Sequence, residues 1–288
     1  MYQKGLSMAL HAQLHILAAT ACVLATGCAA YPTLQERSAL LAPAVQYYAP
    51  ETAVPAPLVI LVSGCGGLTG LQGPKQVMKT YAEAATSAGA YVAVMDSFAP
   101  RGISFEESVR TVCSGLRLHG NERAGDIIAA EALARSHWKV DFTGVILAGW
   151  SHGGWTVMEL LSAGADARDV GGFRIDRAAK ALTPDAVALY YPYCGLLNAT
   201  GRSRWDFKGP LLLLITDAEE ACVEQIEDAR RGAAIETVHF ADNTHAFDEE
   251  DQVPGSEFKY DPAAAARAKE LFHRFVKDQV ERLDRAPT

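Results

Sequence analysis

Six short runs rich in apolar residues recur along the chain, and amphipathic stretches separate them. The runs lie at residues 58–62, 91–95, 145–148, 186–191, 211–215 and 235–240. Short apolar runs bounded by turns are typical of strands that are covered on both faces of a sheet. The stretches between them have the length and spacing of helices, at residues 75–87, 122–137, 155–163, 222–231 and 263–282. This alternation predicts an α/β fold: a doubly wound, mostly parallel sheet with helices on both faces.

The first 28 residues have the pattern of a leader peptide. Lys4 precedes an apolar stretch at residues 16–26, which has the make-up of a signal sequence and is short for a membrane span. The stretch ends in Ala25-Thr26-Gly27-Cys28, which resembles the lipobox of bacterial lipoproteins except that the lipobox prefers Leu where Ala25 stands. We therefore expect export, to the periplasm or to a bacterial envelope membrane through a lipidated Cys28. An uncleaved N-terminal anchor helix is the alternative.

The rest of the chain divides into a lead-in and one globular domain. Prolines recur among small residues in the lead-in, residues 29–56, where we expect an irregular tether. Residues 57–284 carry the whole strand and helix pattern, with no internal repeat and no second domain. The net charge of −8 and the lack of a basic stripe exclude a nucleic-acid partner.

Four of the six cysteines lie outside the leader, at Cys65, Cys113, Cys194 and Cys222. An even number in an oxidising compartment predicts disulfides, and four cysteines allow three pairings. We favour Cys65–Cys113 and Cys194–Cys222, because each pair joins loops at the same edge of the predicted sheet. The spacing of cysteines and histidines shows no metal-ligand pattern, so no metal is expected.

The segment Gly149-Trp150-Ser151-His152-Gly153-Gly154 follows directly on a predicted strand and leads into a predicted helix. On such a tight turn the serine backbone is strained and its hydroxyl stands clear of the sheet edge. A β-carbon at either flanking glycine would collide with the neighbouring strand or helix. The context favours Ser151 as a nucleophile over a plain structural turn.

A serine nucleophile needs a base, and His245 is the candidate among eight histidines. It lies in a polar loop directly after the last predicted strand. In a doubly wound sheet this loop falls on the same edge as Ser151. Its imidazole can take the serine proton and return it to the leaving group. The alternative is an ordinary surface-loop histidine.

The base in turn needs a carboxylate, which should leave the strand that ends at Ile215. Asp217 and Glu219 both follow that strand. We favour Asp217, because it is nearest the strand end and is the commoner residue type. Glu219 stays open, because its offset from Pro210 is the one at which many such enzymes carry the acid.

The negative charge that develops on the substrate oxygen needs two N–H donors. One is expected from His152, the residue after the nucleophile. The other is expected from Cys65, in the glycine-rich loop Ser63-Gly64-Cys65-Gly66-Gly67 that follows the first predicted strand. A flexible glycine turn is the alternative for that loop.

Four segments together resemble the dienelactone hydrolase-like branch of the α/β-hydrolase superfamily, over residues 57–282. They are the Cys65 loop, the Ser151 turn, Asp96-Ser97-Phe98-Ala99-Pro100-Arg101-Gly102 and Thr244-His245-Ala246-Phe247-Asp248. The order serine, acid, histidine along the chain is also that of the α/β-hydrolase fold. The resemblance implies hydrolysis of an ester or lactone through an acyl-enzyme, with no metal or organic cofactor. Founding dienelactone hydrolases carry a cysteine where this chain has Ser151, and the loop after Ile215 is shorter here.

The sequence therefore predicts an exported serine hydrolase whose partner is a small-molecule ester or lactone. A serine peptidase of the same fold and a non-catalytic envelope lipoprotein are the alternatives. Arg101 follows a proline at the sheet edge, where it could pair with a substrate carboxylate. We favour the alternative, in which Arg101 pairs with Asp96 or a nearby acid and braces the loop.

Overall fold

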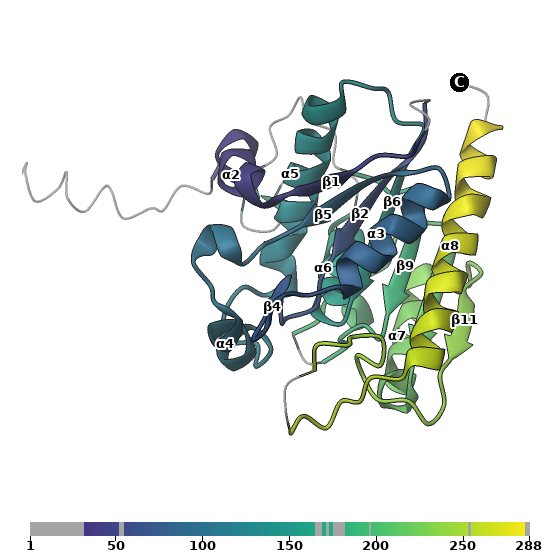
Figure 1. The fold of residues 1–288 in the computed structure, drawn as a ribbon. Coiled ribbons are helices and arrows are strands. Elements are labelled where there is room, and N and C mark those ends of the chain that lie inside the picture. The colour runs from purple at the N-terminus through teal and green to yellow at the C-terminus, as the bar shows by residue number, and fades with distance from the viewer. Residues whose placement is uncertain are drawn as a thin grey trace, which may run out of the picture. The chain divides into compact units, whose positions relative to one another are not determined.

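The computed structural model describes residues 32–51, 55–164, 169–170, 173–174, 182–195, 197–252 and 255–285. The predicted leader, with Cys28, lies outside the described residues. From Thr33 onward the described chain is built around a seven-stranded sheet in the order β1-β5-β2-β6-β9-β10-β11 (Figure 1). The strands are β1 (Gln46–Tyr48), β2 (Leu58–Val62), β5 (Tyr91–Met95), β6 (Val145–Trp150), β9 (Ala186–Tyr190), β10 (Leu211–Ile215) and β11 (Glu236–His239).

All six predicted strands are present and parallel to one another, which confirms the predicted fold class. The chain passes from β2 to β5 on one side of β2 and later from β6 to β9 on the other side. The carboxyl ends of β2 and β6 lie next to each other, with Val62 paired with Gly149. In an open parallel sheet, the point where the winding reverses leaves a crevice beyond the strand ends. This crevice is where the two glycine-rich segments meet.

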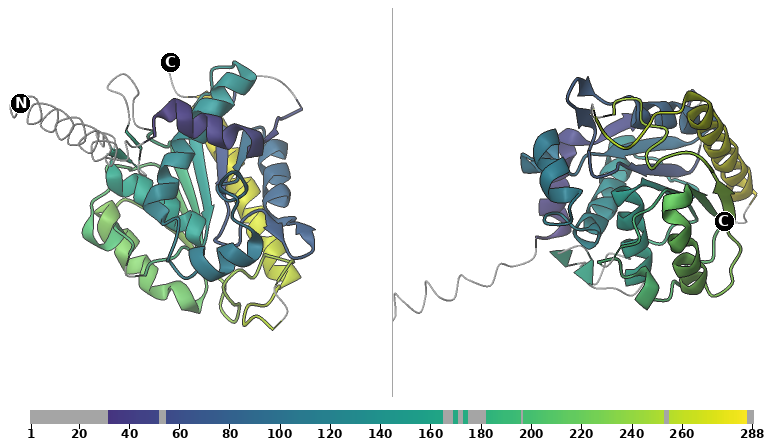
Figure 2. Two further views of the ribbon diagram at one scale, coloured as in Figure 1. Left: turned by 90° about the vertical axis from the view of Figure 1, so that its left-hand side faces the viewer. Right: turned by 90° about the horizontal axis from the view of Figure 1, so that it is seen from below.

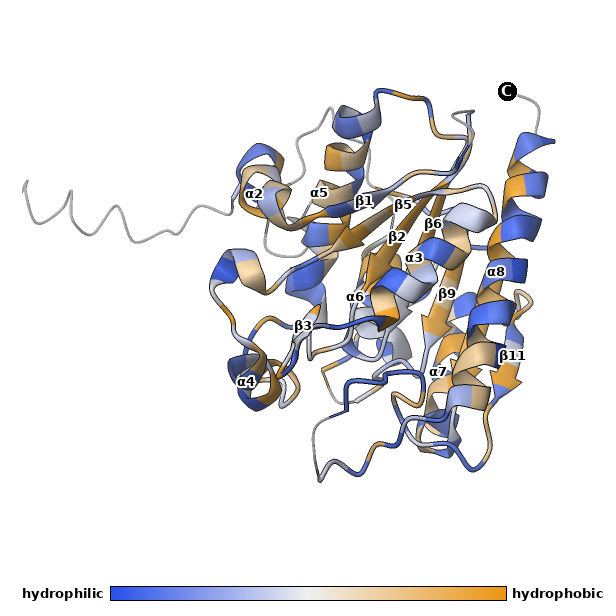
Figure 3. Ribbon diagram, in the orientation of Figure 1, coloured by the Kyte–Doolittle hydropathy of each residue, from blue (hydrophilic) through white to orange (hydrophobic). Residues whose placement is uncertain are grey.

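Helices cover both faces of the sheet (Figures 1 and 2). One face packs against α3 (Val77–Ser87) and α8 (Pro262–Asp284). The other packs against α5 (Gly120–Trp138), α6 (His152–Ala163) and α7 (Glu220–Arg230). Because successive strand residues point to opposite faces, alternate residues of β2, β5, β6, β9 and β10 join opposite apolar clusters, whereas the edge strand β11 is mostly exposed. This two-sided burial explains the continuous apolar runs of the sequence, which colour the strands orange in Figure 3.

The segment predicted as an irregular tether contains regular structure that the sequence analysis missed. Thr33 caps α2 (Leu34–Leu41), with a capping box between Thr33 and Glu36, and this helix packs on α5. β1 adds an antiparallel edge strand beside β5. Both elements are too short to show a clear hydrophobic period, and tertiary contacts stabilise them.

The long segment after β5 is folded into short elements and tied to the sheet edge. It contains η2 (Ala99–Arg101), α4 (Phe105–Glu107) and a π-helical turn, η3 (Ser108–Val112). The disulfide Cys65–Cys113 links its end to the loop after β2. A second disulfide, Cys194–Cys222, links the loop after β9 to α7. The two favoured cysteine pairings are therefore the ones in the structure.

The remaining short elements include two hairpins and two turns. The hairpins are β3–β4 (Thr69–Gly70, Gly73–Pro74) and β7–β8 (Asp169–Val170, Phe173–Arg174), and the turns are η4 (Thr200–Arg202) and η5 (Asp217–Glu219). A turn η1 (Ala42–Ala44) follows α2. None of the described helices combines the length and the apolar character that crossing a membrane requires.

Candidate active site

Ser151 lies on a strained turn between β6 and α6. Its backbone angles are φ 52° and ψ −113°, which a non-glycine residue adopts only where its surroundings enforce it. A β-carbon on Gly149 would lie 2.4 Å from the carbonyl oxygen of Gly153. One on Gly153 would lie 2.0 Å from the carbonyl oxygen of Val62. The glycines therefore allow α6 to begin against the sheet and leave the Ser151 hydroxyl at the crevice.

His245 reaches Ser151 from the loop after β11. Its Nε2 lies 2.8 Å from Ser151 Oγ, and its Nδ1 lies 2.7 Å from Glu219 Oε1. An ionised carboxylate only accepts hydrogen bonds, so Nδ1 carries the proton and Nε2 accepts from the serine hydroxyl. The imidazole is thus oriented with its free lone pair on the serine proton.

Glu219 is held from both sides. Its Oε2 accepts hydrogen bonds from the backbone N–H and the hydroxyl of Thr216, at 3.0 and 2.7 Å. Burial works to raise the pKa of Glu219, but the hydrogen bonds from His245 and Thr216 outweigh burial and hold the pKa below its usual value. Glu219 therefore stays ionised beside the imidazole at neutral pH.

Asp217, the favoured acid, does not contact His245, and the geometry corrects that choice. Its side chain is 65% exposed and its Oδ1 lies 2.6 Å from Nε2 of His239 on β11. The cause is the turn η5, which is capped by Thr216 and directs Asp217 outward while it returns Glu219 to the crevice. Distance from the strand end along the sequence gives no information on this change of direction.

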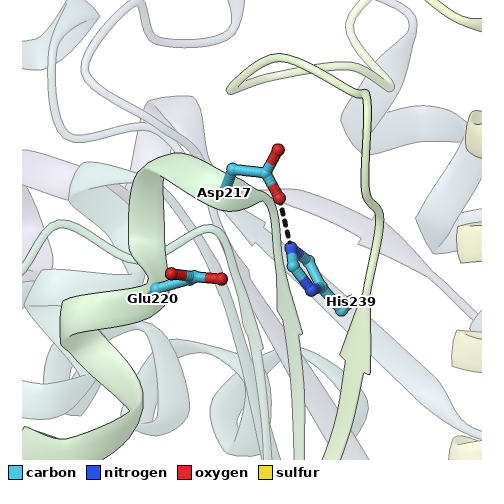
Figure 4. A group of neighbouring side chains, drawn as sticks. All are labelled: Asp217, Glu220 and His239. Carbon is cyan, nitrogen blue, oxygen red and sulfur yellow. Dashed lines mark hydrogen bonds and ion pairs between the residues drawn. The ribbon is translucent and has the colours of Figure 1, made fainter.

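Asp217, Glu220 and His239 form a group whose ligand atoms lie within 4.8 Å of one another (Figure 4). Among the described residues, this is the group of neighbouring side chains whose residue types could bind a metal ion. All three residues are exposed, and one of the ligand atoms of each of Asp217 and His239 is engaged in their mutual hydrogen bond. We assign no metal to it.

The two residues expected to donate N–H groups flank Ser151. His152 is the first residue of α6, so its N–H is among those that a helix leaves without an intrahelical partner. Cys65 follows β2 and, with Ser151 and His245, lines one cavity of about 520 Å³. A β-carbon added to Gly64 would lie 3.5 Å from Ser151 Cβ, so the loop after β2 passes directly beside the serine.

Apolar side chains dominate the wall of this cavity. They come from α3, from the segment around α4 and η3, and from the loops after β9 and β11: Val77, Met78, Phe105, Val109, Tyr193 and Phe258. The charged side chains in the wall include Lys75 and Glu249, which form an ion pair with each other. The cavity has the volume and the largely apolar lining of a small-molecule site.

A buried carboxylate, Asp248, anchors the loop that carries His245. Its oxygens accept hydrogen bonds from Tyr191, Tyr81 and Trp150, at 2.5, 2.6 and 3.2 Å. Burial raises the pKa of Asp248, and the three donors oppose that rise. Trp150 immediately precedes Ser151, so this network joins the two chain segments that bring nucleophile and imidazole together.

Sequence reasoning missed a group of buried charges behind the site. Arg123 is fully buried and contacts His152, while Asp126 forms ion pairs with Arg37 and Arg101. Arg101 thus braces its loop as expected, with Asp126 rather than Asp96 as its partner. The signal was charged residues at positions 123 and 126 among alanines and isoleucines on the face of a predicted helix that faces the sheet.

The sheet order, the reversal of winding between β2 and β6 and the serine at the turn from β6 to α6 define the α/β-hydrolase fold. No family model matches the chain, and no curated protein matches its sequence. Solved structures of the same fold do match it, and dienelactone hydrolases are among them.

A dienelactone hydrolase from Anabaena variabilis is 16% identical, with a TM-score of 0.51, over 80% of this chain and 88% of its own. A dienelactone hydrolase-like promiscuous phosphotriesterase from metagenomic libraries is 18% identical, with a TM-score of 0.55, over 81% and 91%. A propionate-bound esterase from Thermogutta terrifontis is 16% identical, with a TM-score of 0.55, over 81% and 88%. At identities this low, the structural similarity establishes a shared fold, and that fold agrees with the resemblance found in the sequence.

Proposed function

We propose that this protein is a serine hydrolase that cleaves carboxylic esters or lactones through an acyl-enzyme. The observation that carries the proposal is the continuous hydrogen-bond chain from Ser151 Oγ through His245 to Glu219. Serine, imidazole and carboxylate in this order form the triad that activates a hydroxyl at neutral pH. The similarity in fold to an esterase and to dienelactone hydrolases supports the same reaction class.

In the proposed reaction, Ser151 Oγ attacks the ester carbonyl carbon while His245 Nε2 takes the hydroxyl proton. The backbone N–H groups of Cys65 and His152 stabilise the oxyanion of the tetrahedral intermediate. His245 then protonates the departing alkoxide, which leaves the acyl group on Ser151. A water molecule, deprotonated by His245, cleaves that acyl-enzyme in the same way and releases the acid. Glu219 stabilises the imidazolium in both steps.

Two competing interpretations make different predictions. A serine peptidase would use the same three side chains but would cleave amides. A non-catalytic envelope lipoprotein would use the fold for binding. A cavity of about 520 Å³ with a mostly apolar wall favours a small ester or lactone over a peptide.

The decisive test is Ser151→Ala assayed with a short p-nitrophenyl ester, with circular dichroism as a check on folding. We expect loss of turnover by several orders of magnitude and an unchanged fold. Full turnover by the folded variant contradicts the proposal. In parallel, a fluorophosphonate probe should label the wild type and not the variant; a wild type that stays unlabelled from mild acid to mild base favours the non-catalytic alternative.

We further propose that the mature protein is exported, in the periplasm or anchored by a lipid on Cys28. Residues 1–28 are then the leader, and residues 29–56 are a lead-in whose α2 and β1 pack on the hydrolase domain of residues 57–284. The two disulfides support an oxidising compartment. Intact mass of the protein purified from membranes and from the periplasm distinguishes a lipidated Cys28 from a cleaved or retained leader.

A further inference from the structure

Arg123 is a buried cation directly behind the proposed oxyanion site. It belongs to α5 and has no exposed surface. Burial lowers the pKa of Arg123 to about 10, so the guanidinium remains charged at neutral pH. Among the residues the structure describes, no carboxylate forms an ion pair with it. Burying a charge is unfavourable unless other interactions offset the lost hydration, so the position of Arg123 calls for an explanation.

The hydrogen bonds of the two terminal nitrogens of Arg123 converge on the two segments that carry the proposed N–H donors. Both terminal nitrogens donate to the carbonyl oxygen of Ser63, each at 3.1 Å, two residues before Cys65. Nη1 of Arg123 also donates to Nδ1 of His152 at 3.0 Å. A guanidinium only donates, so this contact also places the His152 proton on Nε2. One rigid side chain thus joins the loop after β2 to the start of α6.

The acids near Arg123 are engaged elsewhere. Asp126 is shared between Arg37 and Arg101, at 2.5 and 2.8 Å. Asp96 accepts hydrogen bonds from the backbone N–H groups of Phe98 and Ala99. The charges of both acids still favour the guanidinium through space. Arg123 therefore keeps a positive charge with no carboxylate ion-paired to it among the described residues, behind the turn where a negative charge develops during ester cleavage.

We propose that Arg123 is a positioning residue of the oxyanion site, holding the Ser63–Cys65 backbone and the His152 ring so that both N–H groups point at the oxyanion. Its buried charge also stabilises the tetrahedral intermediate over the uncharged ester, since low-polarity surroundings strengthen the attraction. The inference rests on the proposed hydrolase function. It assigns to Arg123 an effect on the transition state and little effect on binding of the ground-state substrate.

The test compares kcat and KM for the p-nitrophenyl ester with the affinities of two matched inhibitors. The Ser151 oxygen adds to the carbonyl carbon of a trifluoromethyl ketone, and the adduct carries a negatively charged alkoxide. The corresponding methyl ketone binds without that charge. The variants are Arg123→Met and Arg123→Lys. The control is Ser97→Ala, which removes the 3.2 Å hydrogen bond from Arg123 Nε and leaves the bonds to Ser63 and His152 in place.

For Arg123→Met we expect kcat per folded enzyme to fall by about 10²-fold or more, as for loss of an oxyanion donor, with KM changed by less than about 3-fold. Affinity for the trifluoromethyl ketone should fall by a similar factor and affinity for the methyl ketone should not. Arg123→Lys keeps the charge but not the paired donors, so its losses should be intermediate. Ser97→Ala should stay within about 3-fold of wild type throughout.

Equal weakening of both ketones, or unchanged kcat in a folded arginine variant, overturns the inference in favour of a purely structural role. A loss in Ser97→Ala as large as in Arg123→Met overturns it too. If the methionine variant does not fold, the lysine variant decides by the same two ratios. Turnover retained in Ser151→Ala refutes the hydrolase function and this inference together, whereas an effect of Ser151→Ala without any effect of the arginine variants refutes the inference alone.

Discussion

Glu219 Oε1 lies 2.7 Å from His245 Nδ1, although 26 positions separate the two residues in the chain. The contact forms because η5 turns Glu219 inward and because the parallel strands β10 and β11 end at the same edge of the sheet. Asp217, two residues earlier, leaves the same turn in the opposite direction and contacts His239.

This geometry predicts unequal effects for the two acids. Glu219→Gln should lower kcat/KM for a p-nitrophenyl ester by about 10² to 10⁴-fold, because a neutral amide neither fixes the imidazole tautomer nor stabilises the imidazolium. Asp217→Asn is the matched control and should stay within about 3-fold of wild type, because its carboxylate is exposed and bonds to His239, whereas His245 bonds to Glu219. Steady-state kinetics of both variants decide the matter, and the reverse order of effects would show that Asp217 is the working acid.

The Cys65–Cys113 disulfide should matter for turnover as well as for stability. It closes a segment with a sequence separation of 48, and loss of such a loop constraint costs about 4 kcal/mol in the chain-entropy description. Because Cys65 is also a proposed N–H donor, the double variant Cys65→Ala/Cys113→Ala should lower kcat by about 10-fold or more. Urea denaturation and kinetics at a temperature where the variant is folded measure the two effects separately. An unchanged kcat in the folded variant would mean that the loop keeps its shape without the bond.

The free energy of unfolding should decrease as the pH falls below the pKa of an ordinary histidine. Burial, and then the charge of Arg123, hold the pKa of His152 well below 6.5. The unfolded chain therefore binds a proton near pH 6.5 that the folded chain does not, so the free energy of unfolding decreases as the pH falls through this range. One such group contributes at most about 1.4 kcal/mol per pH unit.

His152→Gln isolates that contribution. Between pH 7.5 and pH 5, its free energy of unfolding should depend less steeply on pH than that of wild type, whatever its absolute stability. Urea denaturation at several pH values gives both slopes, and equal slopes would show that His152 takes up a proton in the folded protein.

Tyr81 should contribute to stability without a direct part in turnover. Tyr81→Phe leaves the buried Asp248 with two of its three side-chain donors. Loss of a hydrogen bond to a buried charged group should lower the free energy of unfolding by about 1–3 kcal/mol. Tyr48→Phe is the control, because the Tyr48 hydroxyl donates to Gln46 in an exposed pair, and it should change stability by less than about 0.5 kcal/mol. Urea denaturation of both variants measures these changes. A similar decrease in the denaturation midpoint of both variants would contradict a special role for the Asp248 network.

The strands and helices were predictable because their causes are local. The apolar run at residues 58–62 predicted a buried strand because both faces of β2 are covered, and the N-cap at Asp261 predicted the start of α8. α2 and β1 were missed because short elements depend on contacts with α5 and β5, which are distant in sequence. The disulfides followed from the order of the loops along one edge of the sheet.

Local sterics also explain why Ser151 and His245 could be singled out from the sequence. Gly149 and Gly153 allow a close turn from strand to helix that a β-carbon at either position would block, and the loop after the last parallel strand lies at the same edge of the sheet. Only the tertiary structure decided that Glu219 rather than Asp217 faces His245, and that Arg123 joins the loop after β2 to His152. Those relationships depend on side-chain directions set by a three-residue turn and by a buried helix face. No periodicity in the sequence encodes directions of that kind, because they arise from packing between segments that are far apart along the chain.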